Sequence, residues 1–314
     1  MSELYLVTGG AGFIGSHIVQ RLVRRGERVR VVDNLSTGKI ERIDCVCSAI
    51  DFVEADLADP QVCDRVVDGV DYVLHQAAIP SVQRSIRDPM ASNRANITAT
   101  LNLLESCRAH GVRRLVYAAS SSAYGDTRVL PKHEEMAANP LSPYALQKFV
   151  GERYAKLFFD LYKFETVSLR YFNVFGPSQD PYSEYSAVIP KFITKLLAGE
   201  KLTIFGDGEQ SRDFTYVENV VEANLLALTA GDAAGKMMNL GCGARISLNQ
   251  LVKQLENILG LSAQVEYLPA RAGDVHDSLA DIGLAERLLG YRPLVSVEDG
   301  LARTVEWFRN HPAK

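Results

Sequence analysis

Cysteine is scarce in this chain, and its spacing matches neither a metal site nor a disulfide framework. Five cysteines occur in 314 residues, at positions 45, 47, 63, 107 and 242. The six histidines include no pair four residues apart, so neither residue type predicts a metal centre. An odd number of thiols fits a compartment that keeps them reduced, and we expect a cytoplasmic protein.

Long apolar runs and an excess of positive charge are also missing. No uninterrupted apolar stretch approaches the roughly 20 residues that a membrane-spanning helix needs. The formal net charge is −4, with lysine and arginine scattered along the chain, so there is no basic face for nucleic acid. The first residues, MSELYLVTGG, carry no positively charged leader, and we expect no export signal.

The chain does contain short apolar blocks that alternate with helical patterns. Hydrophobic residues make up 47% of the sequence, enough for a large core. In the first half, helical periodicity covers 13–25 and 90–110, between apolar, β-branched runs that predict strands. These strands are expected at 4–8, 29–33, 50–56, 72–76 and 114–120. Strands that are apolar on both faces and separated by helices predict an α/β fold with a doubly wound, Rossmann-type parallel sheet.

The second half predicts a smaller α/β lobe. A long helix over 142–162, with Pro143 in its first turn, and a strand over 166–172 continue the earlier rhythm. Further helices are expected near 186–198, 217–230 and 247–259, and short strands at 202–206, 237–241 and 263–268. We divide the chain into a dinucleotide-binding domain over 1–175 and a substrate lobe over 176–314, with some later segments returning to the first domain.

A glycine-rich turn, TGGAGFIGS, joins the first expected strand to the first helix. Gly9, Gly12 and Gly15 allow a tight turn and let a pyrophosphate approach backbone amides without a Cβ in the way. A turn that binds nothing is the alternative, but Asp33 closes the second strand 18 residues after Gly15. A carboxylate there accepts hydrogen bonds from a ribose 2′-hydroxyl and repels a 2′-phosphate, which favours NAD over NADP.

The stretch PLSPYALQK places Tyr144 and Lys148 four residues apart at the start of a helix. Alone, this spacing fits a helix start with a solvated lysine equally well. However, the strand over 114–120 ends in Ser120, and the carboxyl ends of parallel strands face the cofactor crevice. A hydroxyl, a phenol and an ammonium would then surround one nicotinamide. Because cations favour the phenolate, we expect the pKa of Tyr144 to fall from its usual value of about 10.

Several segments resemble the extended short-chain dehydrogenase/reductase superfamily. They are the G-x-x-G-x-x-G spacing, DNLSTG at 33–38, Asp56-Leu57 and QAA at 76–78. The resemblance implies that Asp56 and Leu57 flank the adenine, that Asn96 supports the active-site lysine and that Phe172 packs at the nicotinamide. The cofactor-binding residues it implies are Gly9, Gly12, Phe13, Ile14, Gly15, Asp33, Asn34, Ser36, Thr37, Gly38, Asp56, Leu57, Gln76, Ala77, Ala78, Asn96, Tyr144, Lys148 and Phe172.

Within that superfamily, AASSSAYGD resembles the nucleotide-sugar 4-epimerases. The resemblance implies that Ser120 is catalytic with Tyr144 and Lys148, while Ser121 and Ser122 contact the substrate. Dehydratases and decarboxylating relatives carry acidic residues at these next two positions, because they must also remove water or carbon dioxide. Two neutral hydroxyls predict simple oxidation and re-reduction, although how the three serines divide the work stays open.

Later motifs resemble the parts of these epimerases that bind a UDP-sugar. They are LRYFNVFGP (169–177), AVIPKFI (187–193), LTIFGDGEQSRDFTYVENV (202–220) and RAGD (271–274). Arginines suit a diphosphate because their fork geometry matches its oxygens. The resemblance implies two arginine clamps, a pair of residues near uracil and an acid at the ribose or uridine edge. The implied substrate-binding residues are Ser121, Ser122, Asn173, Val188, Thr203, Phe205, Arg212, Arg271, Asp274 and Ser278.

Ser278 bears on the choice of sugar. At this position glucose-restricted members carry a bulky aromatic, and members that accept N-acetylated sugars carry a small residue. Ser278, together with AIPSV at 78–82, therefore predicts UDP-N-acetylglucosamine and UDP-N-acetylgalactosamine as substrates, with UDP-glucose and UDP-galactose as a further pair. The alternatives are an oxidoreductase or dehydratase that releases a keto-sugar, and a regulatory protein that senses NAD. The resemblance also implies a homodimer paired through the helices near 90–110 and 143–162.

Overall fold

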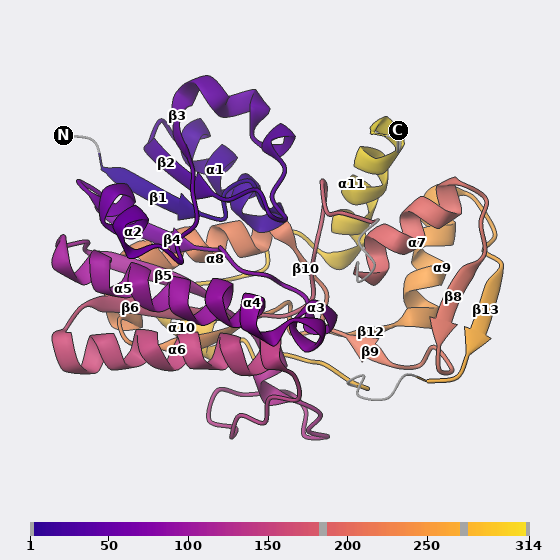
Figure 1. Cartoon of the computed structure of the whole chain (residues 1–314). Coiled ribbons are helices and arrows are strands. Elements are labelled where there is room, and N and C mark those ends of the chain that lie inside the picture. Colours follow the sequence, from indigo (N-terminus) through magenta and orange to yellow (C-terminus); the bar gives the residue numbers. More distant parts are fainter. Residues whose placement is uncertain (1–2, 182–186, 271–275, 312–314) are drawn as a thin grey trace.

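The computed structural model describes residues 3–181, 187–270 and 276–311. Its main feature is a seven-stranded sheet with the order β11-β6-β5-β4-β1-β2-β3 (Figure 1). Every neighbouring pair is parallel, so the predicted doubly wound α/β fold is confirmed. The strands are β1 (Leu4–Thr8), β2 (Arg28–Asp33), β3 (Ile50–Glu54), β4 (Tyr72–His75), β5 (Arg114–Ser120), β6 (Glu165–Tyr171) and β11 (Met237–Leu240).

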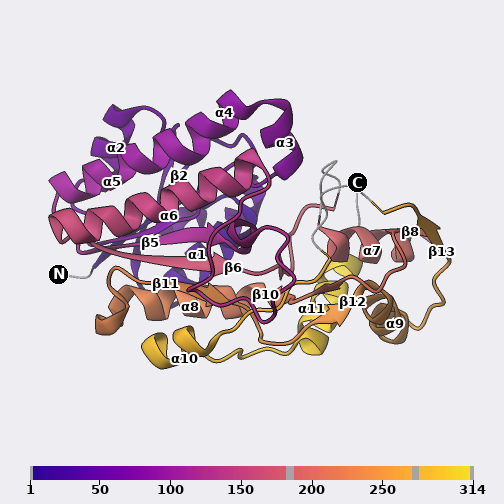
Figure 2. The ribbon, with the colours of Figure 1, turned by 90° about the horizontal axis from the view of Figure 1, so that it is seen from below.

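Helices cover both faces of this sheet, as the view in Figure 2 shows. Alternate residues of β1 point to opposite faces: Tyr5 and Val7 join one buried cluster, and Leu4 and Leu6 join the other. The helices of the first face are α1 (Phe13–Arg24), α8 (Val217–Thr229) and α10 (Gly283–Leu289). Those of the second face are α2 (Pro60–Val67), α5 (Ala99–Ala109) and α6 (Pro143–Tyr162). Burial on both faces explains why the strands are apolar throughout.

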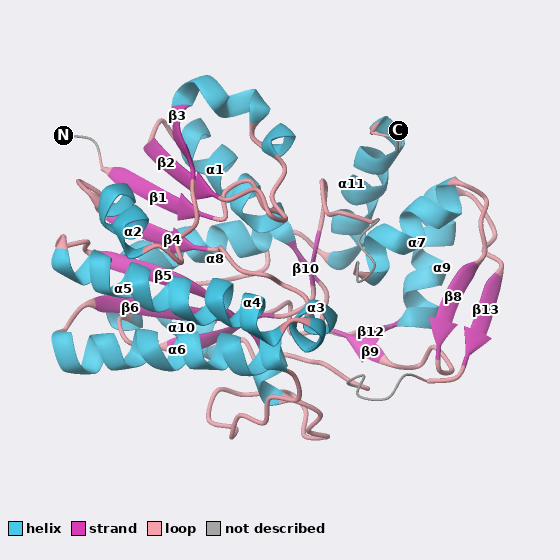
Figure 3. Cartoon of the chain, in the orientation of Figure 1, coloured by secondary structure: helices cyan, strands magenta, loops and turns pink. Residues whose placement is uncertain are grey.

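A smaller region of short sheets lies beside the carboxyl edge of the large sheet (Figure 3). Its helices surround a separate buried cluster that includes Phe175, Phe192 and Leu255. The helices are α7 (Val188–Leu197), α9 (Leu248–Leu259) and α11 (Val297–Asn310). The paired strands are β8 (Leu202–Phe205) with β13 (Val265–Leu268), β7 (Val174–Phe175) with β10 (Thr215–Tyr216), and β9 (Ser211–Arg212) with β12 (Ile246–Ser247).

Segments from the second half of the chain return to the large sheet. The strand expected over 237–241 is β11, which extends the sheet next to β6 with Met238 opposite Leu169. The helix expected over 217–230 is α8, which packs on α1. The first and second halves therefore share one core on this face of the sheet.

The helix expected over 90–110 is interrupted by a π turn. It consists of α4 (Pro89–Asn93), the π turn η3 (Arg94–Thr98) and α5. A π turn inserts one residue into the helical repeat without ending the helix, so the hydrophobic period does not reveal it. The remaining short elements are α3 (Val82–Arg87) and the 3₁₀ turns η1 (Ile40–Arg42), η2 (Asp44–Ala49), η4 (Ser121–Tyr124) and η5 (Gly231–Ala233). Among the helices of the described residues, none is long and apolar enough to cross a membrane.

A buried ion pair fastens α6 to β6. The Arg170 guanidinium donates two hydrogen bonds to the Glu152 carboxylate, at 2.7 and 2.8 Å, and both residues are almost completely buried. The guanidinium also lies over the Tyr124 ring, 4.5 Å from its centroid. Because a buried charge without its partner is costly, this pair fixes the helix that carries the candidate catalytic residues.

We expect Glu152→Gln to lower the free energy of unfolding by about 3–5 kcal/mol, because it leaves the Arg170 charge buried and unpaired. Urea denaturation at pH 7 measures the change. Asp160→Ala is the matched control on the same helix, since it removes the carboxylate of the exposed Lys156–Asp160 pair and should cost less than about 1 kcal/mol. Equal losses in the two variants would contradict a stabilising role of the buried pair.

Candidate active site

The glycine turn packs directly against the turn after β4. Gly9 has φ +65°, and a Cβ on it would lie 2.7 Å from the Cα of Ala77. A Cβ on Gly15 would lie 2.2 Å from the Gly9 carbonyl oxygen. Only glycine fits at these two positions, and Gly9, Gly12 and Gly15 all line a cavity in front of helix α1, which begins directly after Gly12. This cradle therefore fits the expected dinucleotide.

Asp33 is held in place by the backbone at the end of β2. Its carboxylate accepts hydrogen bonds from Ala11 N at 3.0 Å and Leu35 N at 2.9 Å. Burial raises its pKa, and these two backbone donors oppose that shift. Gly38 lies against the same group, because a Cβ there would be 2.7 Å from Asp33 Oδ1. This geometry leaves the carboxylate at the cavity wall, where the sequence places the ribose.

A cavity of about 830 Å³ runs along the carboxyl edge of the sheet. Sixteen of the nineteen predicted cofactor-binding residues line it, and the exceptions are Gly38, Asn96 and Phe172. Asn96 lies behind the cavity wall, where its side-chain oxygen accepts a hydrogen bond from Ile79 N. Phe172 is fully buried against Tyr124. The residues lining the cavity that were not predicted include Arg42, Arg84, Arg87, Gln179 and Asp180. No periodicity or motif distinguishes them, because they come from loops and short helices that meet only in the fold.

The three predicted catalytic residues, Ser120, Tyr144 and Lys148, line one cavity. Ser120 ends β5, and Tyr144 and Lys148 lie one helical turn apart at the start of α6. The helix start is fixed by Ser142, whose hydroxyl accepts a hydrogen bond from Ala145 N. Tyr144 N donates to Ser85 Oγ at 3.0 Å, which ties this helix start to α3.

Hydrogen bonds connect these groups to each other and to the sheet. The Tyr144 phenol hydrogen-bonds with Ser120. The Lys148 ammonium donates to the Ala118 carbonyl at 2.8 Å and lies 5.1 Å from the centroid of the Tyr117 ring. Ser122 Oγ lies 2.8 Å from Ser120 Oγ, so Ser122 contacts the site through Ser120. Neither Ser121 nor Ser122 lines a described cavity.

Burial dominates the protonation of the phenol and the ammonium. It raises the pKa of Tyr144, and the hydrogen bond from Ser120 opposes this shift only partly. It lowers the pKa of Lys148 to about 7. The sequence predicted that the pKa of Tyr144 would fall, and for the protein without cofactor this prediction is wrong. Desolvation of the buried phenol raises its pKa more than the hydrogen bond from Ser120 lowers it.

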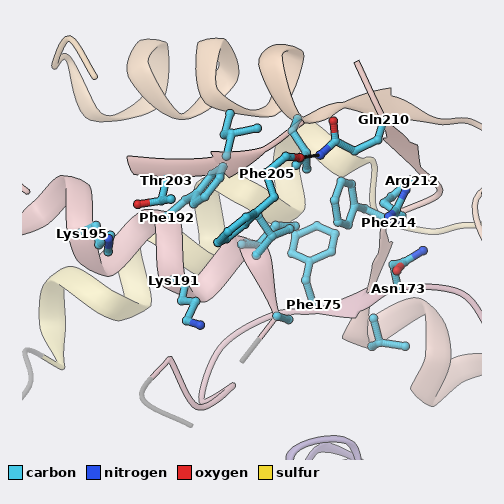
Figure 4. Close-up of a pocket in the computed structure, with 16 residues that line it drawn as sticks. Asn173, Phe175, Lys191, Phe192, Lys195, Thr203, Phe205, Gln210, Arg212 and Phe214 are labelled. Carbon is cyan, nitrogen blue, oxygen red and sulfur yellow. Dashed lines mark hydrogen bonds between the residues drawn. The ribbon is translucent and has the colours of Figure 1, made fainter. Parts of the chain in front are cut away.

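A second cavity, of about 500 Å³, lies in the smaller region (Figure 4). Phenylalanines of β7, α7, β8 and the segment after β9 form much of its wall, while Arg212 and Asn173 lie at one side. Arg212 donates hydrogen bonds to the carbonyl oxygens of Ser211 and His276, at 2.9 and 2.8 Å. The predicted substrate-binding residues that line this cavity are Asn173, Val188, Thr203, Phe205 and Arg212. Asn173 also lines the first cavity, so the two share a border.

The remaining predicted substrate residues lie apart from these walls or outside the described structure. Arg271 and Asp274 lie outside the described residues. Ser278 is buried, and its backbone N donates to the Ser211 carbonyl at 3.1 Å, next to Arg212. The lining residues Lys191, Lys195 and Gln210 were not predicted. Within residues 3–181, 187–270 and 276–311, no group of three histidine, cysteine, aspartate or glutamate side chains could hold a metal ion.

Comparisons with known proteins agree with this geometry. The family model "NAD dependent epimerase/dehydratase family" matches residues 5–241. A UDP-glucose 4-epimerase of Mycolicibacterium smegmatis is 38% identical over 310 residues, which cover 97% of this chain and 98% of that protein.

Two solved structures superpose on nearly the whole chain. A UDP-glucose 4-epimerase of Thermotoga maritima, solved with UDP-glucose, has a TM-score of 0.94 at 41% identity and covers 99% of this chain and 100% of its own. A UDP-N-acetylglucosamine 4-epimerase of Methanobrevibacter ruminantium, solved with UDP-N-acetylmuramic acid, has a TM-score of 0.94 at 39% identity, with the same coverage. These relatives differ in the sugar they bind, so the comparisons leave the sugar open.

The buried Lys148 predicts a specific pH dependence of stability. The folded state binds this proton less readily than the unfolded state, so stability should rise between pH 7, its folded pKa, and 10.5, its ordinary value. Lys148→Met removes this titration and should be more stable than the wild type by roughly 5 kcal/mol below pH 7, with no advantage near pH 10.5. Urea denaturation of the NAD-free protein at pH 6, 8 and 10 measures the difference, with the exposed Lys156→Met as control. A difference that does not change with pH would show that Lys148 is not a desolvated cation.

Proposed function

Because this chain belongs to the NAD dependent epimerase/dehydratase family and is a UDP-sugar 4-epimerase that uses NAD, we propose that it interconverts UDP-N-acetylglucosamine and UDP-N-acetylgalactosamine. UDP-glucose and UDP-galactose form a second, smaller-sugar pair that the same site would accept. The observation that carries the choice of sugar is Ser278, a small buried residue bonded to the strand that bears Arg212.

The position of Ser278 supports room for an acetamido group. Ser211 and Asp277 form a parallel bridge, and Ser278 N bonds the Ser211 carbonyl, so Ser278 follows directly behind the candidate diphosphate clamp. An aromatic side chain at this position would add several heavy atoms beside Arg212. The resemblance places a bulky aromatic at this position in glucose-restricted members, and the smaller serine supports room for a substituent on carbon 2 of the sugar.

The residues around Tyr144 support transient oxidation of the sugar and no elimination. Tyr144 as phenolate removes the proton of the 4-hydroxyl, and Ser120, which hydrogen-bonds the phenol, shares that proton. Lys148 stabilises the phenolate from one turn further along α6. When bound, NAD would supply the acceptor and later the donor of the hydride of carbon 4, and the positive charge of its nicotinamide would favour the phenolate. Gly9, Gly15 and Asp33 are the residues that would hold it.

The second half of the reaction requires the sugar to present its other face. Arg212 in the second cavity, with Arg271 outside the described residues, keeps the UDP in place, and Asn173, which lines both cavities, hydrogen-bonds the diphosphate while the 4-keto sugar turns about that link. Among the described residues, the carboxylates that line the large cavity are Asp33, Asp56 and Asp180, and none belongs to the segments that carry Ser120 and Tyr144. Ser121 and Ser122 stand where the resemblance places the acidic residues of dehydratases, and these neutral hydroxyls support epimerisation over dehydration.

Three further predictions are retained as proposals. The chain divides near residue 175 into cofactor and substrate domains, with later segments such as α8 and β11 returning to the first, and the protein is cytoplasmic. It forms a homodimer through α4–α5 and α6, and the exposed leucines at 146, 157 and 161 on α6 support such a surface.

Tyr144→Phe tests the proposed chemistry. The variant keeps the aromatic ring but loses the acid–base group, so turnover of either UDP-sugar pair should fall roughly a thousandfold while bound NAD is retained. Conversion of UDP-N-acetylglucosamine without added NAD, together with NAD released on denaturation, measures both. Near-normal epimerisation by the variant would remove Tyr144 from its proposed role. Accumulation of a keto-sugar by the wild type would favour the oxidoreductase or dehydratase alternative.

Ser278→Tyr tests the choice of sugar. The larger side chain should lower kcat/KM for the two acetylated substrates by roughly tenfold or more, and change it less than threefold for UDP-glucose and UDP-galactose. Ser278→Ala, which keeps the position small, is the matched control and should leave the preference unchanged. An equal loss on all four sugars would defeat the assignment of Ser278.

A further inference from the structure

His75 is a fully buried histidine at the end of a core strand, where burial lowers its pKa to about 3. Both ring nitrogens have partners: Nδ1 lies 2.7 Å from Thr8 Oγ1, and Nε2 lies 2.9 Å from Thr100 Oγ1. The imidazole is therefore neutral at physiological pH. Neither it nor the two threonines lines a described cavity, and the proposed chemistry does not use them.

The partners of the two threonines determine the direction of every bond. Thr8 Oγ1 accepts from Ala77 N at 3.2 Å and keeps its own proton, which it donates to His75 Nδ1 when the neutral ring carries its proton on Nε2. Thr100 donates to the Asn96 carbonyl at 2.7 Å, so it accepts from His75 Nε2–H. One tautomer, with the proton on Nε2, satisfies all of these bonds.

One end of this series of hydrogen bonds, at Thr8, reaches the floor of the dinucleotide cavity. Thr8 immediately precedes Gly9, and Ala77 is the residue against which Gly9 packs with no room for a Cβ. Both Gly9 and Ala77 line the cavity. Because His75 and Ala77 share Thr8, the hydroxyl fastens the glycine turn of β1 to the turn after β4.

The other end reaches the helix that carries Tyr144 and Lys148. Asn96 lies in the π turn, where its side chain accepts from Ile79 N at 2.8 Å and donates to Gln147 Oε1 at 2.8 Å. Gln147 directly precedes Lys148 on α6 and also donates to Ser92 Oγ at 3.0 Å. Every polar group along this path is buried, so each missing bond would leave a desolvated partner.

We propose that His75 is a positioning residue, which through Thr8 and Thr100 sets the dinucleotide floor at the correct distance from the Tyr144–Lys148 helix. The path Thr8–His75–Thr100–Asn96–Gln147 leads from the glycine turn to the catalytic helix, with Thr100 bonding the Asn96 backbone carbonyl and the Asn96 side chain bonding Gln147. The proposal rests on NAD occupying the large cavity, and not on the choice of sugar.

Thr8→Val and Thr100→Val test the chain, because each removes one hydroxyl with little change in shape. Thr166→Val is the matched control. Thr166 is as buried as the other two threonines and lies in the same sheet as Thr8, and its hydroxyl donates to the Ala155 carbonyl at 2.7 Å, which is not part of the His75 path. The measurements are NAD affinity, from fluorescence titration of the stripped protein, and kcat and KM at saturating NAD. The free energy of unfolding of each variant is measured alongside.

We expect Thr8→Val to weaken NAD binding about tenfold, and Thr100→Val to lower kcat about tenfold with KM for the UDP-sugar unchanged. Thr166→Val should lose comparable stability while keeping both NAD affinity and kcat. The double variant Thr8→Val/Thr100→Val should show non-additive losses, because the two hydroxyls act through one imidazole. His75→Gln, which can still donate to Thr100, should keep more of kcat than His75→Phe.

Two results would overturn the proposal. One is that all three threonine variants lose stability alike while NAD affinity and kcat stay normal, which would make His75 a residue of core stability alone. The other is strictly additive effects in the double variant. NAD affinity is measured directly and does not depend on the proposed sugar, and kcat is measured with whichever UDP-sugar the wild type converts.

Discussion

The site depends on the burial of one cationic side chain at the carboxyl edge of a parallel sheet. Lys148 comes from a helix on one face and reaches over the edge to the Ala118 carbonyl, with the Tyr117 ring beneath it. Taking an ammonium out of water is expensive, and here the cost appears as a pKa lowered to about 7. The same placement puts the ammonium one turn from Tyr144, the residue proposed to act as a phenolate.

The surrounding structure acts to hold this arrangement rigid. Arg170 and Glu152 fasten the middle of α6 to β6, and Ser85 holds its first turn through Tyr144 N. The buried path from Thr8 to Gln147 connects the same helix to the glycine turn. Catalysis by positioned groups needs distances kept within a fraction of an ångström, and buried hydrogen bonds of defined direction supply that constraint.

Much of the fold could be predicted from the sequence because its signals are local. The apolar runs at 4–8 and 114–120 match β1 and β5, and the glycine spacing marks the turn before α1. The π turn at Arg94–Thr98 could not be predicted, and although later segments were expected to return to the first domain, the sequence did not show that residues 237–240 would extend the large sheet. The π turn leaves the helical period of the hydrophobic residues almost intact. The strand at 237–240 pairs with whichever edge of the sheet is still free, and the local sequence does not contain that information.

The sequence by itself determined the chemistry available: a glycine turn followed by Asp33, and a serine, a tyrosine and a lysine in the order that the resemblance requires. Those signals can be recognised in the sequence alone because each depends on residue type and spacing along a single element. Only the tertiary structure decided that burial raises the pKa of Tyr144, that Arg42, Arg84 and Asp180 share its cavity, and that His75 bonds both Thr8 and Thr100. Desolvation and contacts between distant segments arise only after the chain has packed, so no pattern of neighbouring residues contains them.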